Sequence, residues 1–220
     1  DKLYDLAISY MPKYIFNDPI LVAEMTKIDS NIISLIGDKL KKNKKDVKSL
    51  SEEIEDLRND LFYFIKNLDE STIKGASNFY INVLSLLQDI AQSLEYISKV
   101  TFKHVNNNHK ALTFNQIREL KEISLQLETL FERTKFAFSK NNFQEITSIL
   151  DSKQVLLESV REKIDNQISR TKSEESSPKN TTLYFSLLTE TKDLIKSNMA
   201  MLELYNEQYD SNIEPPTKNE

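Results

Sequence analysis

The sequence contains no cysteine and no tryptophan, and only two glycines and five prolines among its 220 residues. A chain without cysteine forms neither a disulfide framework nor a thiolate metal site, which suits a reducing compartment. Scarce glycine and proline leave few of the tight turns that hairpins and strand-to-helix connections require. Leucine, isoleucine, lysine, glutamate and serine are abundant instead, and 39% of the residues are hydrophobic. We therefore expect an all-α protein with a hydrophobic core.

A large net charge is also absent, since 29 basic residues stand against 34 acidic ones for a formal charge of −5. This balance gives no overall attraction to nucleic acid, which we do not expect as a partner. No apolar run reaches the roughly 18 residues of a membrane span, and no signal peptide is recognisable. We therefore expect a soluble chain. It begins at Asp1 rather than at methionine, which suggests excision from a longer protein.

Six segments repeat apolar residues at spacings of three and four, which is typical of helices that bury one face. The segments cover 17–43, 49–68, 71–105, 113–138, 142–171 and 178–209. Ser49 and Glu52 have the spacing of a capping box, which marks a helix start. Thr113 and Gln116 repeat this spacing. The lysine-rich stretch 39–48 is interpreted as the end of the first helix and a turn.

The polar run 106–108 separates the first three helices from the last three, so we expect two tandem antiparallel three-helix bundles. The expected parts are an N-terminal extended segment at 1–16, the bundles at 17–110 and 111–210, and a disordered tail at 211–220. A shift of 104 residues matches part of the third helix with part of the sixth. The matched pairs are Tyr80 and Tyr184, Leu84 and Leu188, Asp89 and Asp193, Ile90 and Leu194, and Ser93 and Ser197. This self-similarity favours an internal duplication.

Residues for common catalytic chemistry are scarce. The sequence has no glycine-rich phosphate loop, no His-Glu-x-x-His helix and no thiol nucleophile, so we expect no enzymatic activity. His104 and His109 are five residues apart, about 500° around a helix, so they do not share a face and are expected in solvent. Asp56 and Asp60 share a face, where they could hold magnesium but are expected to be solvated surface.

Three polar residues occupy inward positions of the last two helices. Lys153 could reach a carboxylate such as Asp89 or Asp193, or extend to the rim of the bundle. Thr191 and Asn198 are expected to set the register of the sixth helix.

Four lysines of the stretch 39–48 form a candidate contact surface for anionic lipid headgroups or an acidic partner. They are Lys41, Lys42, Lys44 and Lys45. The alternative is a solvated helix end, where lysines complement the helix dipole.

Three stretches of the sequence are similar to a known family. Residues 84–98 (LSLLQDIAQSLEYIS) and 104–110 (HVNNNHK) resemble the PhoU-like C-terminal domain of bacterial sodium/phosphate cotransporters, and 183–194 (LYFSLLTETKDL) resembles the matching helix of its second repeat. The resemblance implies two three-helix bundles that regulate phosphate transport at the cytoplasmic face of the bacterial inner membrane. Implied partners are the transmembrane part of the same transporter or a signalling protein. We also consider the inner-membrane surface and a second copy of the chain, in a homodimer, as partners.

The same resemblance implies a metal signature in which an acidic residue precedes an aspartate by four positions, once per repeat. Asp89 and Asp193 match the aspartate, but Ser85 and Thr189 stand at the acidic position. Because hydroxyls are weak ligands, a divalent or ferric ion would be held poorly, and no cofactor is assigned. The alternative to the regulatory function is a free-standing helical scaffold or interaction protein unrelated to phosphate.

Overall fold

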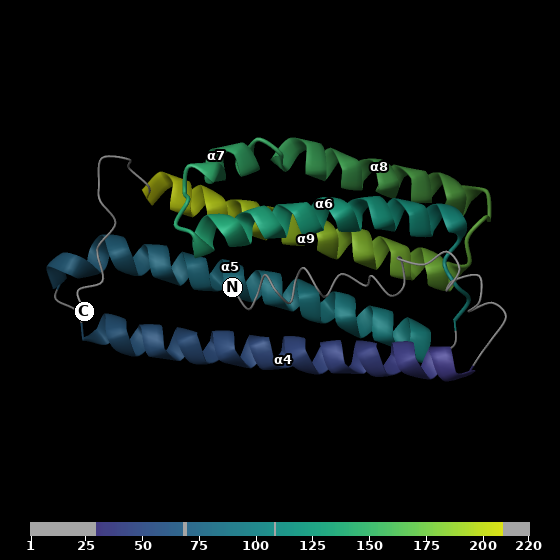
Figure 1. Cartoon of the computed structure of the whole chain (residues 1–220), viewed down its shortest axis with the longest axis horizontal. Coiled ribbons are helices and arrows are strands. Elements are labelled where there is room, and N and C mark those ends of the chain that lie inside the picture. Colours follow the sequence, from purple (N-terminus) through teal and green to yellow (C-terminus); the bar gives the residue numbers. More distant parts are fainter. Residues whose placement is uncertain (1–29, 68–69, 108, 209–220) are drawn as a thin grey trace.

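The computed structural model describes residues 30–67, 70–107 and 109–208, and every regular element in these ranges is an α-helix. The helices are α4 (Ser30–Lys66), α5 (Glu70–Asn106), α6 (Phe114–Ser139), α7 (Glu145–Leu150), α8 (Lys153–Lys172) and α9 (Pro178–Gln208) (Figure 1). The expected all-α helical bundle is confirmed. The extended segment and tail expected at 1–16 and 211–220, and the start of the first predicted helix, lie outside the described residues.

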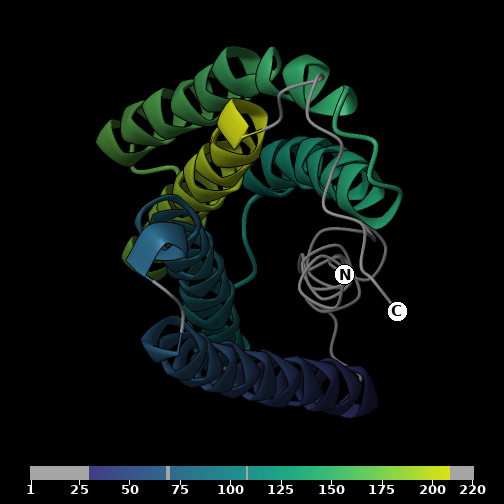
Figure 2. The same ribbon diagram turned by 90° about the vertical axis from the view of Figure 1, so that its left-hand side faces the viewer.

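Helix α9 lies between α5 and the group formed by α6, α7 and α8. It contacts α5 on one side and α6, α7 and α8 on the other, while α4 packs against α5 (Figure 2). The chain direction of α5 opposes that of α9 (Figure 1), and the Phe79 ring near the start of α5 lies 5.0 Å from the Tyr205 ring near the end of α9. The side chains from this centre that are almost fully buried include Ile90, Leu94, Tyr184, Leu188, Leu194 and Ile195. Burial of each such side chain contributes about 1.5–3 kcal/mol, so α9 is the main core helix.

The prediction that a helix ends near Asn43 and another starts at Ser49 is wrong. Helix α4 continues through the lysine-rich stretch without a break, and Ser49 is an exposed residue inside it. Lysine is a good helix former, and the sequence has no glycine or proline between Asp38 and Lys66 that would break the helix at the lysine-rich stretch. Within the described residues, the first predicted bundle therefore consists of α4 and α5.

The helix predicted at 142–171 is divided into α7 and α8. The chain makes a turn at Asp151 and Ser152, where the Ser152 hydroxyl donates to the Ile149 carbonyl at 2.6 Å. Such a local side-chain bond competes with the helical backbone bond and favours a break. The C-terminal half of the described chain thus holds four helices, α6 to α9.

The capping box at the start of α6 is confirmed. The Gln116 backbone N–H donates to Thr113 Oγ1, and the Thr113 backbone N–H donates to Gln116 Oε1 at 2.9 Å. The helices predicted at 71–105 and from Pro178 also agree closely with α5 and α9. Among the described helices, none combines the length and the apolar character needed to cross a membrane.

Candidate functional site

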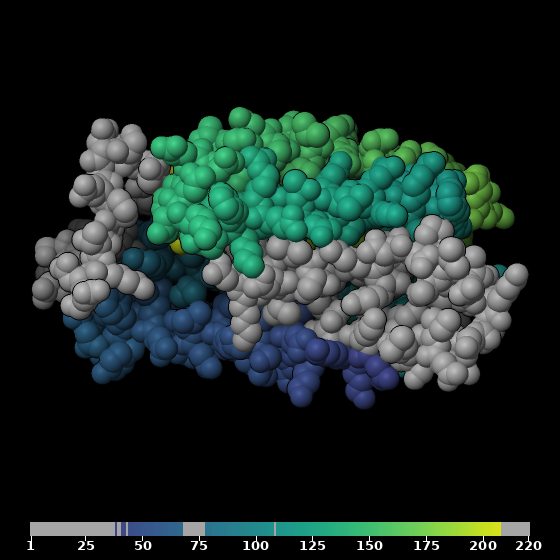
Figure 3. Space-filling view, viewed as in Figure 1, coloured from purple at the N-terminus to yellow at the C-terminus, as the bar shows by residue number. Residues whose placement is uncertain are grey.

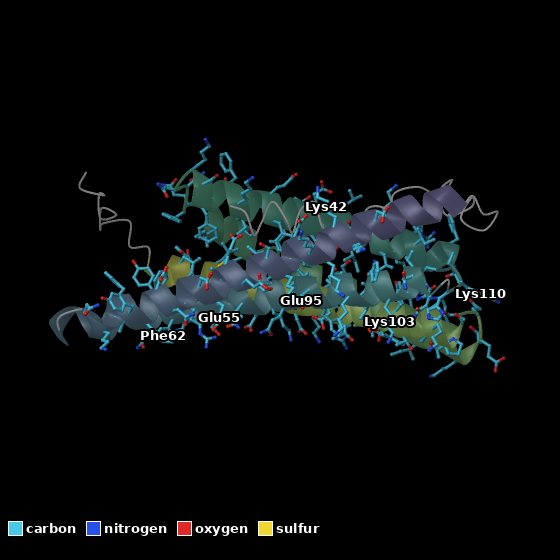
Figure 4. All side chains as sticks on the ribbon, turned by 90° about the horizontal axis from the view of Figure 1, so that it is seen from below. Lys42, Glu55, Phe62, Glu95, Lys103 and Lys110 are labelled. Carbon is cyan, nitrogen blue, oxygen red and sulfur yellow. The ribbon has the colours of Figure 1, made fainter. Side chains whose placement is uncertain are left out.

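The lysines singled out from the sequence all lie on the exposed surface of α4. They are Lys41, Lys42, Lys44 and Lys45. The Nζ atom of Lys44 lies 5.7 Å from the centroid of the Phe102 ring on α5, a distance at which a cation is attracted to the ring face. Figure 4 shows Lys103 of α5 in the same half of this face as Lys42. The contact between Lys44 and Phe102 therefore places this part of α4 beside the end of α5.

Acidic residues follow the lysines on the same helix. They are Glu52, Glu55, Asp56 and Asp60, all exposed. Glu52 pairs with Lys48 at 3.5 Å, and Glu55 pairs with Arg58 at 3.4 Å, both within α4. The expectation that the two aspartates are solvated is confirmed by their exposure. Four of the exposed lysines of α4 thus precede these four carboxylates along the helix, although Asp38 lies before the lysines and Lys66 after the carboxylates.

The apolar seam of α4 is covered over only part of its length. Val47, Leu50 and Ile54 are buried against α5, whereas Leu57 is 54% exposed although it continues the same heptad. The last two turns also expose aromatic rings, and these belong to Phe62, Tyr63 and Phe64. Helix α4 therefore presents charge along its middle and apolar surface at its end (Figure 4).

The aspartates of the metal signature are exposed on the central helix pair. Asp89 lies on α5 and Asp193 on α9, and Ser85 and Thr189 beside them are exposed too. In the ranges 30–67, 70–107 and 109–208, no three His, Asp, Glu or Cys side chains converge as a metal site would require. Two solvated carboxylates with neighbouring hydroxyls are a smaller ligand set than a tightly held divalent ion uses. These residues therefore do not fit a resident metal.

The two histidines lie closer together than their spacing predicts. The His104 and His109 rings are 5.1 Å apart between centroids, because α5 ends at Asn106 and His109 follows in the connection to α6. His104 Nε2 lies 3.1 Å from the Lys110 carbonyl oxygen. Burial lowers the pKa of His104, and the charge of His109 lowers it further. The prediction that they lie on different faces failed because it assumed one continuous helix.

The inward polar residues of α8 and α9 divide into a rim residue and two core residues. Lys153 Nζ donates to Glu203 Oε1 at 2.6 Å, and both side chains remain more than one third exposed. Lys153 thus reaches the rim, and its partner is neither Asp89 nor Asp193. Asn198 is buried and donates to Thr134 Oγ1 of α6 at 3.1 Å. This bond matches the register-setting role expected for Asn198, and Thr191 is buried as well.

A buried polar cluster that the sequence analysis missed lies where α6, α8 and α9 meet. Its centre is the carboxylate of Glu119, which is 6% exposed. Arg170 Nη1 and Nη2 donate to the two carboxylate oxygens at 3.0 and 2.7 Å. The Tyr184 hydroxyl donates to the same carboxylate, as does Asn166 Nδ2 at 3.1 Å. Arg170 and Glu119 therefore form a bidentate ion pair, the geometry of strong charge-assisted hydrogen bonds.

Two buried glutamines extend the cluster toward the start of α9. Gln167 Oε1 accepts from Gln116 Nε2 and from Arg170 Nε, each at 3.0 Å. Gln167 Nε2 donates to Thr181 Oγ1 at 3.2 Å. Because each amide bonds across to another helix, the cluster fixes the positions of α6, α8 and α9 relative to one another.

The pKa values within this cluster keep Glu119 charged and Tyr184 protonated. Burial by itself raises the pKa of Glu119, but hydrogen bonds from Arg170 and Tyr184 hold it below its ordinary value. Burial and the hydrogen bond to Glu119 raise the pKa of Tyr184. The hydrogen bond and charge of Glu119 also raise the pKa of Arg170. The buried charges therefore neutralise each other, which makes the cluster a structural feature of the C-terminal half.

A sequence signal for this cluster does exist. Glu119 lies three residues after Gln116 and four before Ile123, so it occupies an inward position of α6. Gln167 and Arg170 are likewise three apart on the inward side of α8. Polar residues at inward positions mark such a cluster, but their pairing across 51 residues of chain comes only from the tertiary structure.

Comparisons with models of known protein families, with curated proteins and with solved structures give no match to this chain. The similarity to PhoU-like domains therefore rests on the wording of residues 84–98, 104–110 and 183–194 alone. The lysine-bearing surface of α4 is therefore interpreted from the charge and exposure of its own residues.

Proposed function

We propose that this chain is a PhoU-like regulatory module that acts by binding and regulates sodium-dependent phosphate transport at the cytoplasmic face of a bacterial inner membrane. The similarity of 84–98 and 183–194 to that family supports the proposal. These two segments lie on α5 and α9, the antiparallel pair at the centre of the bundle. Matching helices packed against each other at the centre suit a duplicated regulatory domain.

The outer face of α4 is the observation that carries a binding function. This helix packs chiefly against α5, and its opposite side exposes lysines, carboxylates and the rings of Phe62 and Tyr63. The space-filling view shows part of α4 at the surface of the molecule (Figure 3). In contrast, the charges of Glu119 and Arg170 are buried and neutralise each other. Unlike that buried pair, the charged groups on the outer face of α4 are available to a partner.

The alternative is a free-standing helical scaffold unrelated to phosphate. Both functions would use exposed helix surfaces, so the surface chemistry alone does not distinguish them. They differ in whether phosphate uptake responds when the surface is changed.

The test is phosphate uptake in the organism that carries the gene. We expect the fourfold replacement Lys41→Glu, Lys42→Glu, Lys44→Glu and Lys45→Glu to alter how sodium-dependent uptake of radiolabelled phosphate responds to external phosphate. The reason is that charge reversal repels an acidic partner or membrane surface. Uptake measured across a range of phosphate concentrations, with and without sodium, reads out the change.

The matched control reverses four exposed lysines on other helices. They are Lys121, Lys172, Lys192 and Lys196, and their replacement by glutamate should leave uptake as in the unmodified strain. If removal of codons 30–208 also leaves sodium-dependent uptake unchanged, the regulatory proposal is wrong and the scaffold alternative is favoured.

A further inference from the structure

The outer face of α4 is a single stripe with two oppositely charged parts. Its residues recur at spacings of three and four on the side opposite Val47, Leu50 and Ile54. In chain order the exposed stripe contains Lys41, Lys45, Lys48, Glu52, Glu55, Asp56 and Asn59, with Asp38 before them and Tyr63 after them on the same side. The lysine part is centred near residue 45 and the acidic part near residue 55, about 15 Å further along the helix. Figure 4 shows Lys42 and Glu55 at separate positions along this helix.

A stripe of this kind is complementary to itself when one copy is turned around. Two α4 helices can pack side by side in antiparallel directions, related by a two-fold axis at the level of Leu50. In this register each residue faces the residue that lies equally far from position 50 on the other side. Lys48 then faces Glu52 of the second copy, and Lys45 faces Glu55. Each of these pairs occurs twice because the contact is isologous. The stripe residues nearest the axis are Lys48 and Glu52, so the centre of the contact pairs opposite charges.

We propose that the outer face of α4 is a homodimer interface in which the lysine part of one copy binds the acidic part of the other. An anionic membrane is a poorer partner, because Glu52, Glu55 and Asp56 lie on the same stripe as the lysines and would face the lipid phosphates. A second copy satisfies both parts at once. This contact goes beyond the proposed regulatory function, and it is measured on the purified chain without phosphate, so either proposal can fail alone.

The dimer should be weak and strongly dependent on salt. Exposed ion pairs each contribute little, and Lys48 already pairs with Glu52 within its own helix at 3.5 Å. We therefore expect a Kd on the order of 0.1 mM at low ionic strength. The contact should weaken at least tenfold between about 0.01 M and about 0.5 M salt, because the screening length falls from about 30 Å to below 10 Å.

A charge-swap experiment on the purified full chain tests the interface. The basic-part variant carries Lys41→Glu, Lys45→Glu and Lys48→Glu, and the acidic-part variant carries Glu52→Lys, Glu55→Lys and Asp56→Lys. In sedimentation equilibrium each variant alone should be monomeric, because its stripe then carries mainly one sign of charge and repels its copy. An equimolar mixture should recover a dimer that contains one of each. Circular dichroism checks that both variants keep the helical content of the unmodified chain.

The control reverses Lys121, Lys172 and Lys196, which are exposed on α6, α8 and α9, and it should dimerise like the unmodified chain. The proposal is overturned if the unmodified chain is monomeric at millimolar concentration and low salt. It is also overturned if the mixture of variants stays monomeric. Sedimentation with vesicles of phosphatidylglycerol and phosphatidylethanolamine tests the competing partner. If a monomeric chain binds these vesicles and the basic-part variant does not, the stripe binds a membrane and the dimer proposal is overturned.

Discussion

The α4–α5 pair and the α6–α9 half differ in where their charged side chains lie and in how fully their apolar seams are buried. In α6–α9 the inward charges of Glu119 and Arg170 are buried, and each has its partner on another helix. In α4 the charges face outward, and the apolar seam is buried at Leu50 but open at Leu57. The C-terminal half is therefore held in one arrangement by specific bonds, whereas α4 keeps surface that a partner can cover.

The largest effect should come from removing Arg170. Arg170→Met leaves the Glu119 carboxylate buried without its counter-charge, which should lower the free energy of unfolding by about 3–5 kcal/mol. Urea denaturation followed by circular dichroism measures this change. Arg161→Met on the same helix is the control, because the Arg161 side chain is 73% exposed and its ion pair with Glu158 is long at 4.0 Å. We expect that control to change stability by no more than about 0.5 kcal/mol.

A second variant separates loss of the ion pair from loss of packing. The double replacement Glu119→Leu with Arg170→Met removes both charges, so it should recover much of the stability that Arg170→Met loses. A double variant as unstable as the single one would mean that the arginine stem, and not its charge, stabilises the C-terminal half.

The next largest effect should be a difference in stability between substitutions at two positions of the α4 apolar seam. Leu50→Ala removes a side chain that is 4% exposed, and the resulting cavity should cost about 2–5 kcal/mol of unfolding free energy. Leu57→Ala, one heptad further on, removes a side chain that is 54% exposed and should cost less than about 1 kcal/mol. Thermal and urea denaturation of the two variants measure the contrast. Equal costs would show that Leu57 is covered in solution and that the comparison between the halves is wrong.

Local sequence signals predicted those parts of the fold whose cause is local. The capping box of Thr113 and Gln116 and the proline at 178 mark the starts of α6 and α9 correctly, because caps act within one turn of helix. The lysine-rich stretch misled the prediction because surface charge is compatible with a turn and also with the exposed face of a helix. Only a breaker residue would have decided between them, and the sequence has none there.

The buried cluster could be predicted only in part. The inward positions of Glu119 and Arg170 follow from helical spacing, but which helices meet depends on the path of the whole chain. The same limit applies to Lys153, whose expected partners were aspartates and whose actual partner is Glu203. Spacing identifies the side of a helix on which a polar group lies, whereas the partner on a distant helix is a tertiary property.

The pH dependence of stability gives the smallest and most specific test of the C-terminal cluster. Hydrogen bonds from Arg170 and Tyr184 keep the pKa of Glu119 below its ordinary value in the folded chain. A depressed folded pKa contributes stability that is present above the unfolded pKa of about 4.3 and is lost as the pH falls through the folded pKa. We therefore expect the unfolding free energy, measured by urea denaturation from pH 7 down to pH 3, to fall more steeply below about pH 4.3 in the unmodified chain than in Glu119→Gln. Glu158→Gln, which changes an exposed carboxylate on α8, should leave the acid slope as it is. Identical acid slopes for the unmodified chain and Glu119→Gln would mean that the buried carboxylate gains nothing from its partners on folding.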